Sequence, residues 1–86
     1  MKPERHVMLS QRLVKTERME IDGRVYTADY FEATTEHGTQ RYTCEALIGP
    51  GDRIIVDGSS LDDLKWRMAR LMPATLYSRM LARAAA

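Results

Sequence analysis

The sequence predicts an α+β fold, an antiparallel β-meander of three or four strands followed by a C-terminal helical segment packed on one face of the sheet. Three observations support this class. Turn residues alternate with β-prone runs up to residue 57, serines precede a run with helical spacing from residue 61, and 86 residues supply only one hydrophobic core. We therefore expect a single domain over residues 1–86, and the sequence leaves the N-terminal arm, residues 1–10, open between a flexible, a strand-like and a helical conformation.

The first hairpin is predicted from Asp22-Gly23, which lies between two β-prone runs. A type I′ turn needs positive φ at both central residues, and Asp-Gly is one of the pairs that adopt it most readily. This turn places the first strand over residues 11–21. The second strand follows over residues 24–34, where aromatic and β-branched residues are frequent.

Two further turns bound the remaining strands. Residues 36–38 (Glu-His-Gly) reverse the chain before residues 39–48, whose apolar side chains alternate with period two. Residues 49–52 (Gly-Pro-Gly-Asp) suit a type II turn, with Gly51 supplying the positive φ at its third position. We expect a short strand over residues 53–57.

A helix is predicted to begin at Ser59-Ser60, because serine hydroxyls accept hydrogen bonds from the free backbone amides of a first turn. At 100° per residue, five apolar side chains then fall within an arc of about 100°. They are Leu61, Leu64, Met68, Leu71 and Met72. We expect this stripe to cover the sheet.

A second apolar face is predicted on the other side of the same helical segment. Trp66 falls nearly opposite the sheet-facing stripe, and the apolar residues after Met72, Leu76 among them, fall on the side of Trp66. Arg70 follows one turn later, where its guanidinium group can stack on the indole ring. The candidate protein-binding residues of this face are Trp66, Ala69, Arg70, Tyr77, Met80 and Leu81.

Pro73 lies between the two apolar faces, and a proline inside a helix removes a backbone hydrogen bond and tends to kink or interrupt the helix. Two outcomes are open. If the helix breaks before Pro73, a second helix over residues 74–84 turns and packs on its own domain. If the helix continues with a kink, it offers its second face to another chain.

The net charge of +1 divides into +3 over residues 1–15, −5 over residues 16–60 and +3 over residues 61–86. The simplest interpretation is that the basic ends dock on the acidic middle, within the fold or across a dimer. Nucleic-acid binding is less expected and would have to use the basic residues of the helix. These are Lys65, Arg67, Arg70, Arg79 and Arg83.

Three strands followed by one helix is also the layout of small DNA-binding modules. In topology, without a shared motif, the predicted fold is similar to integrase arm-binding and AP2-like domains, and that resemblance implies a sheet placed in a groove of DNA. The charge of −5 on the sheet segment argues against this mode, because it repels phosphates.

Few residues suggest chemistry. Cys44 is the only cysteine, which fits a cytoplasmic protein without an internal disulfide, and ten arginines against three lysines suggest a bacterial or phage source. Cys44 with His37 is the one candidate nucleophile–base pair, but a packed core thiol is the favoured interpretation. His6, His37 and Cys44 lack the paired spacing of zinc ligands. We expect no catalysis, metal or cofactor, and no membrane-spanning segment.

The sequence therefore predicts a non-enzymatic protein–protein interaction module. We expect a homodimeric small adaptor or inhibitor that acts through the C-terminal helical face, with a heterologous protein as the other partner for that face. The alternative function is a small nucleic-acid-binding regulator that uses the basic residues of the helix.

Overall fold

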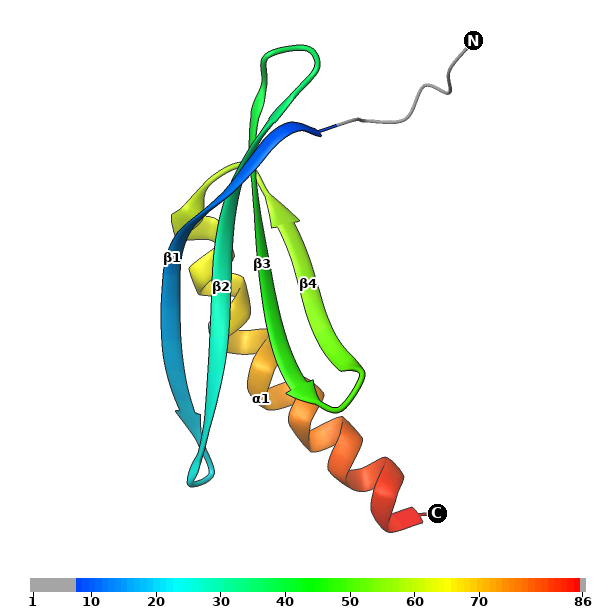
Figure 1. Ribbon diagram of the computed structural model, residues 1–86. Coiled ribbons are helices and arrows are strands. Elements are labelled where there is room, and N and C mark those ends of the chain that lie inside the picture. Colours follow the sequence, from blue (N-terminus) through cyan, green and yellow to red (C-terminus); the bar gives the residue numbers. More distant parts are fainter. Residues whose placement is uncertain (1–7, 86) are drawn as a thin grey trace, which may run out of the picture.

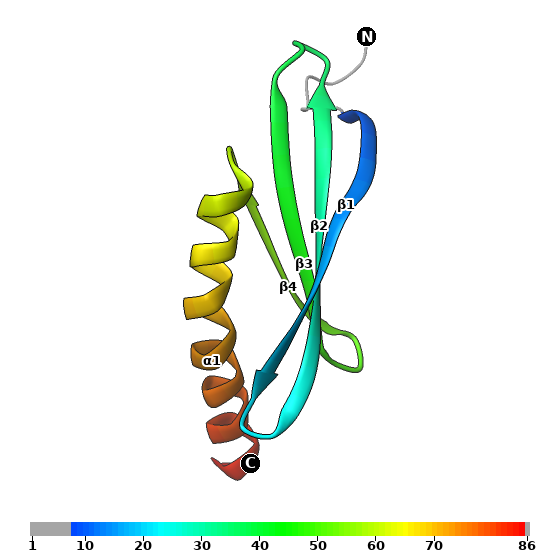
Figure 2. The same cartoon turned by 90° about the vertical axis from the view of Figure 1, so that its left-hand side faces the viewer.

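The computed structural model describes residues 8–85 and confirms the α+β class. Four strands, β1 (Met8–Ile21), β2 (Arg24–Thr35), β3 (Gln40–Gly49) and β4 (Asp52–Gly58), form one antiparallel sheet in the order β1-β2-β3-β4. One helix, α1 (Leu61–Ala85), runs across one face of this twisted sheet (Figures 1 and 2). Residues 8–10 of the expected arm belong to β1, and the expectation for residues 1–7 lies outside the described residues.

The turns have the backbone geometry that their residue types predict. Asp22 and Gly23 have φ values of 53° and 82°, the two positive angles that a type I′ turn requires. Gly38, between β2 and β3, and Gly51, between β3 and β4, have φ values of 81° and 69°. These conformations exclude most side chains, so glycine at these positions determines where the chain reverses.

Hairpin register then determines which side chains share a face of the sheet. Tyr30 of β2 pairs with Cys44 of β3, and Ala28 pairs with Ala46. All four side chains are buried and belong to one core cluster. Because three of the four are small, a helix can approach the centre of the sheet closely.

β1 contains an irregularity between Leu13 and Lys15 that changes its face assignment. Leu13 pairs with Phe31, whereas Lys15 pairs with Tyr30. Since neighbouring residues of β2 point to opposite faces, these two residues of β1 do so as well. Lys15 is thereby placed on the helix side of the sheet, and Leu13 on the open side.

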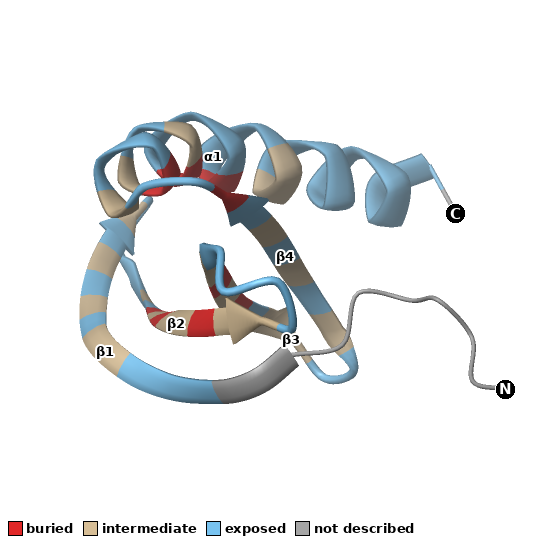
Figure 3. Ribbon diagram, turned by 90° about the horizontal axis from the view of Figure 1, so that it is seen from above, coloured by how far each residue is buried: buried red, intermediate tan, exposed pale blue. Residues whose placement is uncertain are grey.

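The buried surface of α1 is a line of residues four apart. Leu64, Met68 and Met72 are fully buried, and Leu76 packs against the same cluster (Figure 3). Each step of four residues advances 40° around the axis, so this line winds gradually around the helix as it crosses the sheet. The expectation that Leu71 belongs to the sheet-facing stripe is wrong, since its side chain is 38% exposed, and so is the assignment of Leu76 to the opposite face.

Of the two outcomes left open at Pro73, the break does not occur, because α1 is one helix of 25 residues with Pro73 inside it. Proline has no amide to donate to the carbonyl of Ala69. Ala69 is exposed, so water can reach that carbonyl. Packing of Met72 and Leu76 on either side of Pro73 holds the two halves of the helix on one sheet. The kink itself stays a prediction.

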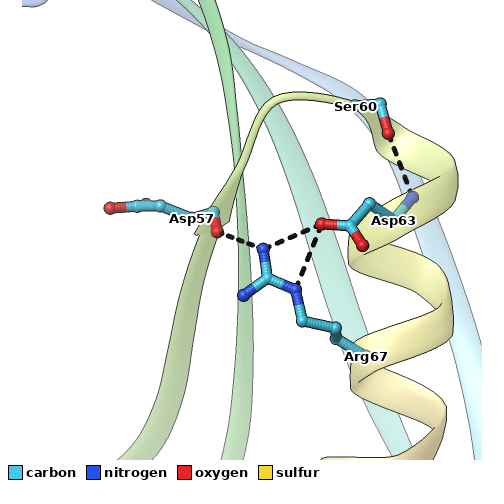
Figure 4. A network of polar contacts seen from close by, with 4 residues as sticks. All are labelled: Asp57, Ser60, Asp63 and Arg67. Atoms are coloured by element: carbon cyan, nitrogen blue, oxygen red, sulfur yellow. Dashed lines mark hydrogen bonds and ion pairs between the residues drawn. The ribbon is translucent and has the colours of Figure 1, made fainter.

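A polar network attaches the first turns of α1 to the end of β4 (Figure 4). The Ser60 hydroxyl oxygen accepts a hydrogen bond from the Asp63 amide at 3.1 Å, which confirms the predicted cap. Arg67 Nη2 donates to the Asp57 backbone carbonyl at 2.8 Å and to Asp63 Oδ2 at 2.9 Å. Gly58 is buried here, and a Cβ added to it would lie 3.0 Å from both Leu64 Cδ2 and Arg67 Nη2. A side chain at this position would therefore require Leu64 and Arg67 to shift by a few tenths of an ångström.

The burial pattern makes a prediction about two neighbouring helix residues. Met68→Ala removes a fully buried side chain, and we expect it to lower the free energy of unfolding by about 2–5 kcal/mol. The matched control Leu71→Ala truncates a partly exposed side chain and should cost less than about 1 kcal/mol. Urea titration followed by circular dichroism measures both. Equal losses would contradict the assignment of Leu71 to the edge of the contact.

Candidate functional site

The candidate site is the part of α1 that its contact with the core leaves exposed. We call it the outer face of α1. Its residues are Trp66, Ala69, Arg70, Tyr77, Met80 and Leu81, all six of which the sequence predicted, and all are exposed. The exposed fractions of the large side chains are 61% for Trp66, 59% for Tyr77, 53% for Met80 and 50% for Leu81. The predicted orientation of Trp66 away from the core is confirmed.

The outer face stays exposed because the sheet occupies only one line of the helix. Packing against the core ends with Leu76, and every residue from Tyr77 to Ala85 is exposed. In Figures 1 and 2 the last turns of α1 extend past the turn that joins β3 and β4, and the β1–β2 hairpin reaches nearly as far. The large apolar side chains of these turns are about half exposed, and Tyr77 and Met80 border a cleft against the β1–β2 hairpin.

Arg70 and Trp66 form the stacked pair that the sequence predicted. The guanidinium carbon of Arg70 lies 4.7 Å from the centre of the Trp66 ring system. A cation placed over an aromatic face at an exposed site contributes about 0.5–1 kcal/mol. The pair gives the outer face a flat, partly ordered aromatic surface near its N-terminal end.

Two clefts border the outer face on the side of β1, and no pattern in the sequence predicts them. One, of about 390 Å³, lies between Trp66 and Ala69 of the helix and Met19 of β1. The other, of about 310 Å³, lies between Tyr77 and Met80 and the tip of the β1–β2 hairpin. The size of both clefts depends on the distance between α1 and the β1–β2 hairpin, and only the tertiary structure determines that distance.

The basic residues proposed for nucleic-acid binding do not form one surface. Arg67 is bound to Asp63 and to the Asp57 carbonyl. Arg79 donates two hydrogen bonds to Asp52, from Nε at 2.7 Å and from Nη2 at 3.2 Å. These bonds hold the pKa of the Asp52 carboxyl below its ordinary value, with a smaller contribution from the nearby charge of Arg83.

Two further members of the basic set, Lys65 and Arg70, lie beside other residues of the fold. The nearby ammonium group of Lys65 lowers the pKa of Lys15, because two like charges repel. Arg70 covers Trp66. Contacts between the basic ends and the acidic middle, Arg79 with Asp52 and Arg12 with Glu32, confirm the simplest interpretation of the charge pattern.

Cys44 has the environment of a packed core thiol, as predicted. It is fully buried beside Tyr30, and burial raises the pKa of its thiol to about 11. His37, the candidate base, lies in the exposed turn between β2 and β3. The Tyr30 hydroxyl donates to Glu17 Oε1 at 3.2 Å, and burial raises the pKa of this tyrosine as well. None of these groups has the activated state of a nucleophile.

Across residues 8–85, no group of three or more His, Cys, Asp or Glu side chains is arranged to hold a metal ion. His6 lies outside this part of the chain. Within the same residues, no helix combines the length and the apolarity needed to cross a membrane. Comparisons of the chain with protein families, with curated proteins and with solved structures found no match.

The environment of Cys44 makes a prediction about thiol reactivity. At pH 8, a buried thiol with a pKa of about 11 has little thiolate, so we expect iodoacetamide to alkylate it at least about 100-fold more slowly in the native protein than in guanidinium chloride. The control is Leu47→Cys in a Cys44→Ala background, which places a thiol at an exposed position of the same strand. Mass spectrometry follows both reactions. Similar native rates for the two thiols would contradict a closed core at Cys44.

Proposed function

We propose that this protein is a non-enzymatic protein–protein interaction module that associates with a second copy of itself through the outer face of α1. The observation that carries the proposal is that one helix exposes about half of four large apolar side chains, Trp66, Tyr77, Met80 and Leu81. Burying apolar surface contributes about 25 cal/mol per Å². Large apolar side chains exposed together are typical of an interaction surface.

The residue types of the outer face support an interface centre. Tryptophan, tyrosine, methionine and arginine are enriched at the centres of protein interfaces, and tryptophan, tyrosine and arginine dominate their binding energy. The outer face contains one or more of each, and Arg70 is already held against Trp66. A partner would therefore meet side chains that lose little conformational freedom on binding.

The open face of the sheet is a weaker candidate surface. It also exposes large apolar residues, but there is one on each strand. They are Leu13, Val25, Leu47 and Ile55. Polar pairs lie between them, including the ion pair of Arg53 with Glu45 and the hydrogen bond from the Thr43 hydroxyl to Asp57 at 2.8 Å. Scattered apolar residues among paired charges are ordinary surface.

In this proposal the dimer acts as a small adaptor or inhibitor, because pairing through α1 leaves the two open sheet faces available to a larger assembly. A heterologous protein on the outer face is the competing partner. The alternative function as a nucleic-acid-binding regulator has less support, since Arg67, Arg70 and Arg79 are engaged in contacts within the fold.

The proposal predicts the molar mass in solution. At high micromolar concentration, size-exclusion chromatography with light scattering should give twice the chain mass. Met80→Glu places a charge in the centre of the outer face and should give the mass of one chain, because an unpaired buried carboxylate is costly. The matched control Ile55→Glu, at an equally exposed position on the open sheet face, should stay dimeric.

Circular dichroism confirms that both variants keep the fold. A wild-type protein that is monomeric at these concentrations would contradict the homodimer. A Met80→Glu variant that remains dimeric would contradict the assignment of the interface to α1.

A further inference from the structure

A third cleft, of about 460 Å³, opens where the second half of α1 passes the lower end of the sheet in Figure 1. Its walls come from three segments, which are the start of β2, the turn between β3 and β4, and residues 76–83 of α1. None of the six residues of the outer face lines it. Clefts of about 300–1,000 Å³ with an apolar lining and a few polar groups are typical ligand sites. The third cleft is therefore a candidate site apart from the surface that the proposed function uses.

The floor of the third cleft is the edge of the hydrophobic core. Tyr26, Ile48 and Leu76 line it, and all three are partly buried against the core cluster. Pro50 and Ala82 add exposed apolar surface at the rim. A tyrosine ring beside aliphatic side chains suits an apolar or aromatic group of a ligand. Such a group would extend the core and displace water from its edge.

The charged residues of the third cleft leave a positive excess. They are Arg24, Asp52, Arg79 and Arg83. Arg79 donates two hydrogen bonds to Asp52, so the charges of this pair cancel. Among residues 8–85, neither Arg24 nor Arg83 takes part in an ion pair, and both are exposed. Two guanidinium groups without a bound carboxylate therefore border one apolar cleft.

Local structure places both arginines beside this floor. The first hairpin turn puts Arg24 at the start of β2, two residues before Tyr26, so both lie on the helix-facing side of the sheet. Arg83 follows Leu76 by seven residues, which is nearly two turns, so both lie on one side of α1. The charge of Arg83 also contributes to the lowered pKa of Asp52, which shows that its guanidinium group lies near that carboxylate.

We propose that the third cleft binds a small organic anion, a carboxylate or phosphate joined to an apolar or aromatic body. Guanidinium groups bind both kinds of anionic head through charge-assisted hydrogen bonds, and the floor of the cleft accommodates the body. The negative end of the helix dipole lies at the end of α1, but it equals about half an elementary charge. The charges of Arg24 and Arg83 outweigh it. The proposal goes beyond the proposed function and does not depend on the dimer.

The neighbouring cleft, between the outer face and the tip of the β1–β2 hairpin, is a less suitable position for the anionic head. It shares Arg24 and Arg83 with the third cleft, but Asp22 lines it as well. Within the described part of the chain no arginine binds the carboxylate of Asp22, in contrast to that of Asp52, so Asp22 would repel an anion. We therefore place the head between the two arginines on the side of Pro50.

A matched set of probes tests the site. Naphthyl phosphate and naphthoate join an aromatic body to an anionic head, naphthalenemethanol keeps the body without the charge, and inorganic phosphate keeps the charge without the body. Each is titrated into the isotope-labelled full chain at about 0.15 M salt, where exposed charges more than about 8 Å apart are screened. Amide chemical shifts report the position of binding and the dissociation constant.

We expect an aromatic anion to shift the amides of the third cleft with a dissociation constant of about 1 mM or below, as is typical for a ligand of this size. It should bind at least about fivefold more tightly than naphthalenemethanol and than inorganic phosphate, because each of these lacks one half of the recognition. Whether naphthyl phosphate or naphthoate binds more tightly identifies the preferred head.

Two sets of variants test the residues. Arg24→Gln and Arg83→Gln should each weaken binding of the aromatic anion by about three- to fivefold, the effect of losing one exposed ion pair. Arg18→Gln, at an exposed arginine of β1 outside this cleft, should leave it unchanged. Ala82→Glu adds a carboxylate at the rim and should weaken binding more than Ala84→Glu, which adds the same charge to the same helix outside the cleft. All five positions are exposed, and the amide spectra of the free variants check the fold.

The outcomes decide the proposal. Binding that needs both head and body, and that weakens at Arg24 and Arg83 but not at Arg18, supports the site. Equally tight binding of naphthalenemethanol overturns the role of the guanidinium groups, and equally tight binding of inorganic phosphate overturns the role of the apolar floor. Shifts confined to other surfaces, equal losses in Ala82→Glu and Ala84→Glu, or the absence of any shift at several times the expected dissociation constant overturn the site itself.

Discussion

The packing of α1 on the centre of the sheet is the interaction on which the rest of the structure depends. Leu64, Met68 and Met72 form one buried cluster with the small residues Ala28, Cys44 and Ala46 and with Tyr30, and larger, partly buried strand residues pack around it. This core is small, as expected for 86 residues, and a single line of helix residues makes the contact. Most of the circumference of the helix is consequently left for water or for a partner.

Charged contacts fix the two ends of the same helix. At the N-terminal end, Arg67 joins Asp63 to the last residues of β4, and near the C-terminal end Arg79 joins Asp52 at the turn between β3 and β4. These pairs are exposed, so each contributes little to stability. These pairs matter for function instead, because the guanidinium groups of Arg67 and Arg79 are bound within the fold and add less to a basic surface on the helix.

The outer face of α1 follows from this arrangement. The last turns of this 25-residue helix extend past the turn between β3 and β4 with their apolar side chains about half exposed. Trp66 and Arg70 add exposed surface nearer the N-terminal end. The proposal of a self-associating module rests on these side chains, which stay about half exposed while a separate line of residues packs on the sheet.

The sequence by itself determined the local features. Positive φ at Asp22-Gly23 and at Gly51, the serine cap of α1, and the outward orientation of Trp66 follow from the conformational preferences of a few neighbouring residues. Only the tertiary structure decided that the helix continues through Pro73, and that Leu76 packs against the core in place of Leu71. Packing on both sides of Pro73 outweighs one lost backbone hydrogen bond. The residues that contact the twisted sheet wind gradually around the helix. The stripe predicted from the sequence lies within one fixed arc, so it includes Leu71 and leaves out Leu76.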